Sequence, residues 1–229
     1  MVGRRSAPPP GWVRFGTLRR IFPVSPQFGF DRGTPVDRYY IEKHLRLHAR
    51  DIRGRVLEIG DDAYTKKFGG RQVNASDILD LSERNERATI IADLTSASQI
   101  PSEAYDCIIL TQTLQFVDDV HMALETLHRV LKPGGVLLAT LPGISKIARD
   151  KHNQWHDQWR LTAYSCQKVF QRPFSADALS VAAYGNVLSA VAFLEGLAAH
   201  ELTEEELDFR DPDFEVIIAV RAVKSNHQH

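Results

Sequence analysis

The feature that most constrains the fold is a short apolar segment, residues 56–59, that lies between Gly54 and Gly60. A short apolar segment bounded by glycines is typical of a strand buried on both faces of a parallel sheet. Gly60 permits a sharp turn and the close approach of a ligand. Ligands of open α/β sheets bind beyond the carboxyl ends of the strands, where the strand order reverses. We therefore expect Gly60 to form the floor of a binding site.

The residues after Gly60 limit the kind of ligand. A dinucleotide site would continue as Gly-x-Gly-x-x-Gly and hold a pyrophosphate at the next helix, but here Asp61, Asp62 and Ala63 follow. Two carboxylates would repel a pyrophosphate, since like charges about 4 Å apart cost roughly 4 kcal/mol at an effective dielectric near 20. The pattern favours a positively charged nucleoside without phosphate, such as S-adenosylmethionine (SAM), although a plain strand and turn would also fit.

Composition indicates one globular domain. The chain has 229 residues, of which 43% are apolar, so it can bury a large core. The net charge of −1 carries no nucleic-acid-binding signature. Charge is uneven, however: residues 1–30 hold five arginines and no acids, and residues 201–215 hold eight acids and one arginine. We expect a basic arm and a solvated acidic face; a sharper alternative has the arm docking on an acidic partner or on the chain's own acidic face.

Cysteine usage and hydropathy exclude several other classes. The two cysteines, Cys107 and Cys166, lie far apart, and the histidines show no ligand spacing, so we expect neither a disulfide framework nor a metal site. No segment reaches 18 apolar residues, and residues 1–30 lack the apolar stretch of a secretory signal. We expect a cytoplasmic protein without a membrane span.

Apolar periodicity and helix-breaking residues predict alternating strands and helices. The first helix should cover residues 35–49, with Thr34 as its cap and Asp37 completing a Thr-x-x-Asp box. Further helices are expected over residues 117–132, 162–171 and 187–199. Strands are expected over residues 56–59, 71–75, 89–92, 105–110, 136–141, 179–184 and 214–223.

Acidic residues follow the second and third expected strands. Asp77, followed by Ile78, comes 17 positions after Gly60, and an acid at the end of the second strand can accept both ribose hydroxyls. Asp93, followed by Leu94, comes directly after the third strand and can face an adenine amino group. Each aspartate would also fit a turn or a helix cap.

Three segments together resemble the class I SAM-dependent methyltransferases, in particular those of type 11. They are Val-Leu-Glu-Ile-Gly at 56–60, Tyr-Asp-Cys-Ile-Ile-Leu at 105–110 and Leu-Lys-Pro-Gly-Gly-Val-Leu at 131–137. The resemblance covers about residues 50–224 and implies a three-layer, Rossmann-like α/β fold. Its seven-stranded sheet would be mostly parallel with an antiparallel last strand and helices on both faces. Most family members carry two more glycines where this chain has Asp61-Asp62-Ala63.

Residues 30–40 and 159–162 resemble a narrower group, bacterial methyltransferase domains found near glycosyltransferases. This resemblance implies a small-molecule acceptor, namely a hydroxyl of a sugar or glycan precursor, and raises association with glycosyltransferases as a hypothesis. The expected organisation is a basic arm over residues 1–33, a SAM-dependent methyltransferase domain over 34–224 and a tail over 225–229. The arm should pack on the domain through its aromatic side chains, Phe15, Phe22, Phe28 and Phe30.

The resemblance also assigns expected roles to single residues. Glu58 and Gly60 would shape the methionine pocket, while Thr111 and Gln112 would lie beside the sulfonium. An alcohol acceptor needs a general base, and the candidates in the loop after the fifth strand are His152, His156 and Asp157. The residues expected to close over the site or to contact the acceptor are Arg38, Tyr39, Tyr40, Trp159 and Arg160. Of these, the two tyrosines would form walls and Arg160 would hold an anionic group.

Two other functions remain open at this point. One is a non-catalytic, methyltransferase-like module that binds a partner protein through its basic arm. The other is a nicotinamide-dependent oxidoreductase, which the missing glycines and the paired aspartates disfavour.

Overall fold

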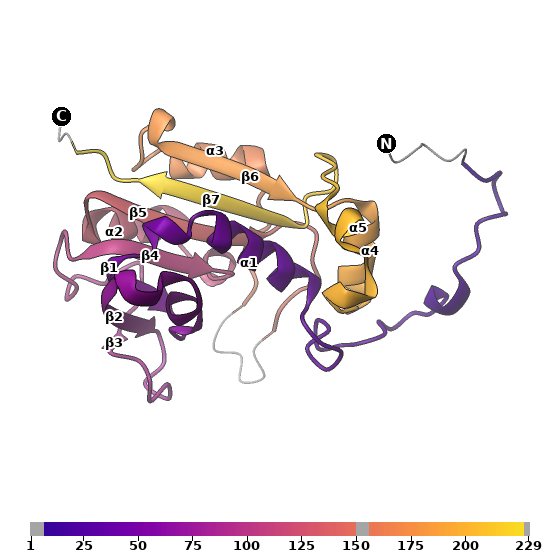
Figure 1. Cartoon of the computed structure of the whole chain (residues 1–229), viewed down its shortest axis with the longest axis horizontal. Coiled ribbons are helices and arrows are strands. Elements are labelled where there is room, and N and C mark those ends of the chain that lie inside the picture. Colours follow the sequence, from indigo (N-terminus) through magenta and orange to yellow (C-terminus); the bar gives the residue numbers. More distant parts are fainter. Residues whose placement is uncertain (1–6, 150–155, 227–229) are drawn as a thin grey trace.

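The computed structural model describes residues 7–149 and 156–226, and its centre is a seven-stranded sheet in the order β3-β2-β1-β4-β5-β7-β6 (Figure 1). Strands β1 to β5 run parallel, and β7 is antiparallel to both of its neighbours, β5 and β6. The predicted α/β fold with an antiparallel last strand is confirmed. The strands are β1 (Gly54–Ile59), β2 (Val73–Asp80), β3 (Ile90–Ile91), β4 (Tyr105–Thr111), β5 (Leu131–Pro142), β6 (Leu179–Tyr184) and β7 (Ile217–Val223).

Helices cover both faces of the sheet because the central strands are apolar on both sides. In β4, Ile108 and Leu110 belong to the core cluster beneath α2 (Val120–Val130) and α3 (Ala163–Phe170). Cys107 and Ile109 alternate with them and belong to the cluster beneath α1 (Val36–Leu47) on the opposite face. A third cluster packs the beginning of α1 against α4 (Val187–Leu194) and α5 (Glu204–Asp208). Alternating side chains of one buried strand therefore serve two helical layers.

The second strand ends five residues later than predicted. It pairs with β1 along its length, and Ile59 at the end of β1 lies opposite Leu79. Because β1 needs a hydrogen-bonding partner up to its carboxyl end, β2 continues through Asn74, Ser76 and Asp77 to Asp80 despite their polarity. Asp77 is consequently a mid-strand residue opposite Leu57, and the expectation that it follows the strand is wrong.

The predicted cap of the first helix is also wrong. Pro35 occupies the N-cap position of α1, and no side chain caps the helix. The Thr34 carbonyl instead accepts a hydrogen bond of 2.7 Å from the Ala199 backbone N–H. This contact holds the entry to α1 beside the segment after α4. The fourth helix ends at Leu194, earlier than predicted, because Gly196 turns the chain with a φ of +71°.

Within the described part of the N-terminal arm, residues 7–33, contacts with the domain are found near its end. The Val24 backbone N–H donates to the Glu195 carboxylate at 3.1 Å, and the Phe28 ring lies 6.0 Å from that of Phe193. Phe15 and Phe22, in contrast, are 59% and 72% exposed, and Figure 1 shows this part of the arm leading away from the sheet. Of the four phenylalanines expected to pack, Phe28 contacts the domain, Phe30 is 56% exposed although its ring lies beside Arg38, and Phe15 and Phe22 are exposed.

Within residues 7–149 and 156–226, none of the helices has the length and apolar character that a bilayer-spanning segment needs.

Candidate active site

Two cavities lie where β1 ends. The first, here called the strand-end cavity, has a volume of about 390 Å³. The second, here called the Arg38 cavity, has a volume of about 530 Å³, and Ile59 at the end of β1 lines both. Both volumes fall in the range of about 300–1,000 Å³ that is usual for small-molecule sites. Two cavities of suitable size therefore lie beyond the carboxyl end of the first strand, where the sequence predicts the site.

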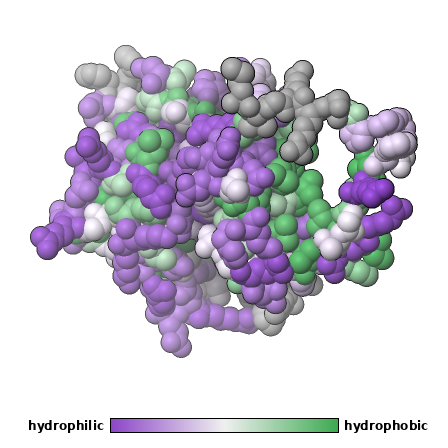
Figure 2. Space-filling model, turned by 45° about the vertical axis from the view of Figure 1, so that its right-hand side comes forward, coloured by the Kyte–Doolittle hydropathy of each residue, from purple (hydrophilic) through white to green (hydrophobic). Residues whose placement is uncertain are grey.

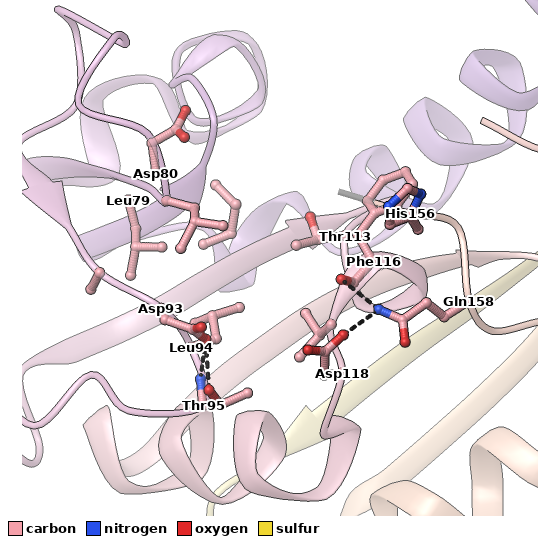
Figure 3. A pocket seen from close by; sticks show the side chains of 14 residues that line it. Leu79, Asp80, Asp93, Leu94, Thr95, Thr113, Phe116, Asp118, His156 and Gln158 are labelled. Atoms are coloured by element: carbon pink, nitrogen blue, oxygen red, sulfur yellow. Dashed lines mark hydrogen bonds between the residues drawn. The ribbon is translucent and has the colours of Figure 1, made fainter. Parts of the chain in front are cut away.

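The strand-end cavity lies between two sets of loops (Figure 3). Ile59, Asp80 and Asp93 come from the ends of β1, β2 and β3, and Thr113 and Phe116 come from the loop after β4. Gln158 and Asp118 also line the cavity, and the Gln158 side chain donates to the Asp118 carboxylate at 2.5 Å. The remaining lining residues are Leu79, Leu81, Ala92, Leu94, Thr95, Val117 and His156.

The Asp80 carboxylate is fixed by neighbours in its own turn. Its Oδ1 accepts from the Ser82 backbone N–H at 2.9 Å, and its Oδ2 accepts from the Asn85 amide at 2.7 Å. The Asn85 amide also donates to the Gly60 carbonyl at 2.7 Å. One side chain thus ties the end of β2 to the turn after β1. Asp80 is the acid that stands at the end of the second strand, where Asp77 was expected.

Asp93 is oriented in the same local manner. Its Oδ1 accepts from both the backbone N–H and the hydroxyl of Thr95, at 2.8 Å each. This is the turn-capping arrangement that the sequence left open, and the residue and its neighbour Leu94 also line the strand-end cavity. The two acids Asp80 and Asp93 therefore border one mostly apolar hollow.

The Arg38 cavity is built around a partly unsatisfied guanidinium. Arg38 Nη1 donates to the Tyr64 hydroxyl at 2.6 Å, and the group lies 5.8 Å from the centre of the Phe30 ring. Its Nε is buried and has no hydrogen-bond partner among the described residues. A buried donor without a partner is costly, so this nitrogen is suited to an acceptor atom of a ligand. Glu42, Glu58, Asp61 and Thr111 line the same cavity.

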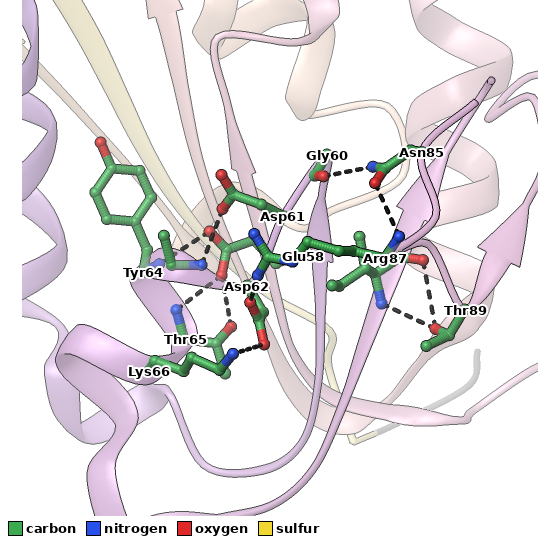
Figure 4. A network of polar contacts seen from close by, with 12 residues as sticks. Glu58, Gly60, Asp61, Asp62, Tyr64, Thr65, Lys66, Asn85, Arg87 and Thr89 are labelled. Carbon is green, nitrogen blue, oxygen red and sulfur yellow. Dashed lines mark hydrogen bonds and ion pairs between the residues drawn. The ribbon is translucent and has the colours of Figure 1, made fainter. Parts of the chain in front are cut away.

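Glu58 closes the turn that follows β1 (Figure 4). Its carboxylate accepts from the Tyr64 backbone N–H at 3.1 Å and from the Thr65 backbone N–H and hydroxyl at 2.7 Å each. The side chain is 2% exposed, and burial raises its pKa to about 7 against the opposing effect of these hydrogen bonds. Glu58 therefore holds the turn after β1 in place beside the Arg38 cavity, which it also lines.

The two aspartates that replace the family glycines point to different surroundings. Asp62 is only 8% exposed and forms ion pairs with Arg87 and, at 2.7 Å, with Lys66. The hydrogen bond from Lys66 lowers the pKa of Asp62. Asp61 accepts from the Ala63 backbone N–H at 2.9 Å and lines the Arg38 cavity. Only one of the two negative charges is consequently offered to a ligand.

Asp77 lies outside both cavities. It accepts hydrogen bonds of 2.8 Å from Arg55 and 3.1 Å from the Tyr105 hydroxyl. Its neighbour Ile78 is buried in β2 and does not line either cavity. Gln112, with a φ of +50°, donates from its side chain to the Thr140 hydroxyl at 3.4 Å and also lies outside them. Because β2 continues to Asp80, Asp77 lies within the strand and away from both cavities, so the expectation that it binds the ribose is not supported.

The two tyrosines of α1 face away from the site. Tyr39 donates from its hydroxyl to Asp208 at 2.7 Å, and Tyr40 donates to the Leu207 carbonyl at 2.9 Å. Tyr40 is 1% exposed and stacks on Tyr184. The expectation that they form walls of the site is wrong, because successive residues of a helix lie about 100° apart and Arg38 already takes the face toward the cavity.

The candidate bases and acceptor-contacting residues in the loop after β5 lie in different surroundings. Asp157 is held by the Arg160 guanidinium and by the Ala148 backbone N–H at 2.9 Å. Because the Arg160 guanidinium is paired with Asp157, it is already engaged and does not hold an anionic group of a ligand as expected. The same pairing makes Asp157 poorly suited to act as a base. Trp159 donates its indole N–H to the Val117 carbonyl at 2.8 Å, outside both cavities. His156 lines the strand-end cavity, and His152 lies outside the described residues.

Asp80 was missed for a reason that the sequence could have revealed. It stands 20 positions after Gly60, which is closer to the usual spacing of about 20 than the 17 positions of Asp77. The polar residues of β2 obscured the length of the strand. Leu79 and Leu81, which also line the cavity, were missed for the same reason.

No three His, Cys, Asp or Glu side chains lie close enough together to hold a metal ion within residues 7–149 and 156–226.

Comparison with family models now identifies the class of protein. Residues 32–184 match the model of a methyltransferase domain family. The match spans more than half of the chain, so the protein belongs to this family. The family assignment and the fold support the predicted cofactor, SAM, and favour a methyltransferase over a nicotinamide-dependent enzyme.

Solved structures with the same fold are distant in sequence. A SAM-dependent methyltransferase from Mesorhizobium loti is 19% identical, with a TM-score of 0.56 over 85% of this chain and 100% of that one. A chain from the complex between the Haloferax volcanii Trm112 methyltransferase activator and the putative methyltransferase is 15% identical. Its TM-score is 0.53, and the match covers 90% of this chain and 100% of that one. The search of curated proteins finds no match.

A third neighbour was solved with ligands. It is phosphoethanolamine N-methyltransferase 2 of Haemonchus contortus in complex with phosphomonomethylethanolamine and S-adenosylhomocysteine. This chain is 16% identical to it, with a TM-score of 0.51, and covers 52% of that chain and 80% of its own length. Likeness at this level concerns the fold, and the acceptor has to be argued from this chain's own site.

Proposed function

We propose that this protein is a SAM-dependent O-methyltransferase that acts on a hydroxyl of a small, sugar-like acceptor. The observation that carries the proposal is the pair of open cavities on the two sides of Ile59, one mostly apolar with acids and one with an unsatisfied arginine. A non-catalytic module would have no need to keep this hollow open. The sugar-like acceptor rests on the resemblance of residues 30–40 and 159–162.

The residues present fit the charges and shape of SAM. Asp80 is positioned to accept the ribose hydroxyls and Asp93 to accept from the adenine amino group, with Leu94 and Ile59 against the base. In the Arg38 cavity, the free Arg38 Nε suits the methionine carboxylate and Asp61 suits its ammonium group. A Cβ added to Gly60 would meet no atom within 4 Å, so the floor between the two halves is clear of the protein's own side chains.

Bound SAM supplies an activated methyl group on a sulfonium. The protein has to orient the acceptor, exclude water and take up the proton of the hydroxyl. Thr111 stands at the end of β4 beside the Arg38 cavity and His156 stands in the strand-end cavity. We assign the base to His156 or to His152; next to His156, Asp157 is held by Arg160.

Cofactor binding tests the first half of the proposal. Isothermal titration calorimetry with SAM and S-adenosylhomocysteine should give micromolar dissociation constants for the native chain. Asp80→Ala should weaken binding by about 100-fold, since two charge-assisted hydrogen bonds are lost. Asp77→Ala is the matched control, an equally acidic residue three positions away in the same strand, and it should change binding less than about threefold.

Methyl transfer tests the second half. Incubation with labelled SAM and a panel of sugar nucleotides and glycan precursors should label a hydroxyl, and His156→Ala or His152→Ala should reduce kcat far more than it changes SAM affinity. Labelling of an amine or a protein instead would replace the proposed acceptor. Absence of SAM binding at millimolar concentration would favour the alternative, a methyltransferase-like module that only binds a partner.

A further inference from the structure

Helix α4 presents an apolar stripe to solvent. Val187, Val191 and Leu194 are 52%, 40% and 42% exposed and follow the i, i+4, i+7 spacing of one helical face. Leu188 extends the stripe. Phe209, a residue that is 51% exposed, lies near the start of the helix, where its carbonyl accepts a hydrogen bond from the Asn186 side chain. The opposite face of α4 is buried in the domain. A helix that is apolar all round normally has partners on every side, so the stripe is a candidate interface.

Unpaired acids border this stripe. Glu204, Glu205 and Asp213 are exposed and form no ion pair within the part of the chain that the structure describes. The α5 helix that carries the two glutamates packs on α4, and the Asp211 backbone N–H, two residues before Asp213, donates to the Gly185 carbonyl at 2.9 Å. The stripe and its acidic border therefore form one surface, which we call the α4 face (residues 187–194 and 204–213).

The arm has the complementary character. Trp12, Ile21 and Phe22 are 74%, 92% and 72% exposed, and the backbone hydrogen bonds of residues 9–20 are local. The arm also carries three arginines that have no ion pair among the described residues: Arg14, Arg19 and Arg20. Figure 1 places α4, α5 and the arm on the same side of the molecule, and Figure 2, in which that side is turned forward, shows hydrophobic patches between hydrophilic ones to the right of its centre.

We propose that the arm of one copy, residues 12–22, covers the α4 face of a second copy, and that the exchange is reciprocal. The arm is anchored by the Ser25 backbone N–H, which donates to the Glu195 carbonyl at the end of α4 at 2.9 Å, so it starts beside the stripe. It then leads away from its own domain (Figure 1). A two-fold axis lets two such chains satisfy both arms and both faces at once. Apolar side chains meet the stripe, and arginines meet the unpaired acids.

Sedimentation equilibrium of the full chain tests the association. The native protein should be a dimer whose dissociation constant rises at moderate salt, because the charge pairs are screened. Val191→Asp in the centre of the stripe should raise that constant by at least about tenfold. Leu47→Asp is the control, since Leu47 is 70% exposed on α1, and it should leave the constant unchanged. A monomer at all concentrations, or an equal effect of both variants, overturns the proposal.

Charge reversal tests the reciprocal exchange and separates it from folding of an arm onto its own domain. A chain with Arg19→Glu and Arg20→Glu should be monomeric, as should a chain with Glu204→Lys and Glu205→Lys. Their mixture should form a one-to-one heterodimer, because each arm then meets a face of opposite charge. Failure of the mixture to associate, or binding of the native arm to anionic vesicles without dimer formation, contradicts the assignment.

Discussion

The two halves of the candidate site differ in how their polar groups are held. In the strand-end cavity, Asp80 and Asp93 are fixed by residues two to five positions away in their own turns. In the Arg38 cavity, Arg38 depends on Tyr64, 26 positions away on another element. The first half is thus a product of local turns at the ends of strands. The second exists only when α1 packs on the turn after β1.

This difference predicts how the halves respond to damage. Local turns persist as long as the sheet persists, whereas a cavity formed by packing between elements is lost with any shift of α1. We therefore expect substitutions in the turn shared by both halves to have the largest effects. Substitutions confined to the Arg38 cavity should affect binding of the methionine end and leave adenosine binding intact.

Gly60→Val should give the largest effect, because it damages both halves. Gly60 has a φ of +83° and faces open space, so a β-branched residue would be strained and would occupy the floor of the site. We expect the dissociation constant for SAM to rise by about a thousandfold, roughly 4 kcal/mol. Calorimetry measures this change, and circular dichroism checks that the sheet remains. Binding of SAM at native affinity would remove Gly60 from the site.

Glu58 should make stability depend on pH. Its folded-state pKa of about 7 lies above its ordinary value of 4.5, so protonation favours the folded state. This stabilisation is fully present below about pH 4.5 and is lost as pH rises through about 7, which amounts to roughly 3 kcal/mol. Urea unfolding of the native chain and of Glu58→Gln across this window measures it. The free energy of unfolding of Glu58→Gln should not fall over this pH range. If the native chain and the variant lose stability in parallel as pH rises, another group is responsible.

Arg38→Met should damage only the half that depends on packing. Loss of a charge-assisted hydrogen bond costs about 2 kcal/mol, so affinity for SAM should fall about 30-fold while affinity for adenosine stays the same. Arg160→Met is the matched control, because Arg160 is engaged by Asp157 outside the Arg38 cavity. Equal losses for SAM and adenosine in Arg38→Met would show that the two halves are not independent.

The aspartates that replace the family glycines should give the smallest effects and should differ from each other. Asp61→Asn should weaken SAM binding about fivefold, since it removes one exposed charge near the ammonium group. Asp62→Asn should leave binding unchanged and lower the free energy of unfolding by less than about 1 kcal/mol, because its partners Lys66 and Arg87 are 70% and 57% exposed. Calorimetry and urea unfolding of both variants separate these outcomes, and a reversed order would contradict the geometry of the turn.

The sequence by itself determined the fold class and where most of the strands lie along the chain. The apolar run before Gly60 and the segments at 105–110 and 136–141 predicted the buried strands, because strands covered on both faces are apolar at most positions, although β5 begins earlier than predicted, at Leu131. The last strands were equally visible, and β6 has the predicted bounds. Asp93, Leu94 and Thr111, which the sequence singled out at polar strand ends, line the two cavities: Thr111 is the last residue of β4, and Asp93 and Leu94 follow β3 after Ala92.

Only the tertiary structure decided where β2 ends and which side chains turn inward. The length of β2 is set by pairing with β1, which no local pattern in residues 71–80 records, and that pairing moved the strand-end acid from Asp77 to Asp80. Tyr39 and Arg38 are neighbours in sequence, yet they face opposite surroundings because α1 is wedged between α5 and the turn after β1. Local propensity predicts elements, but the rotation and extent of an element depend on what packs against it.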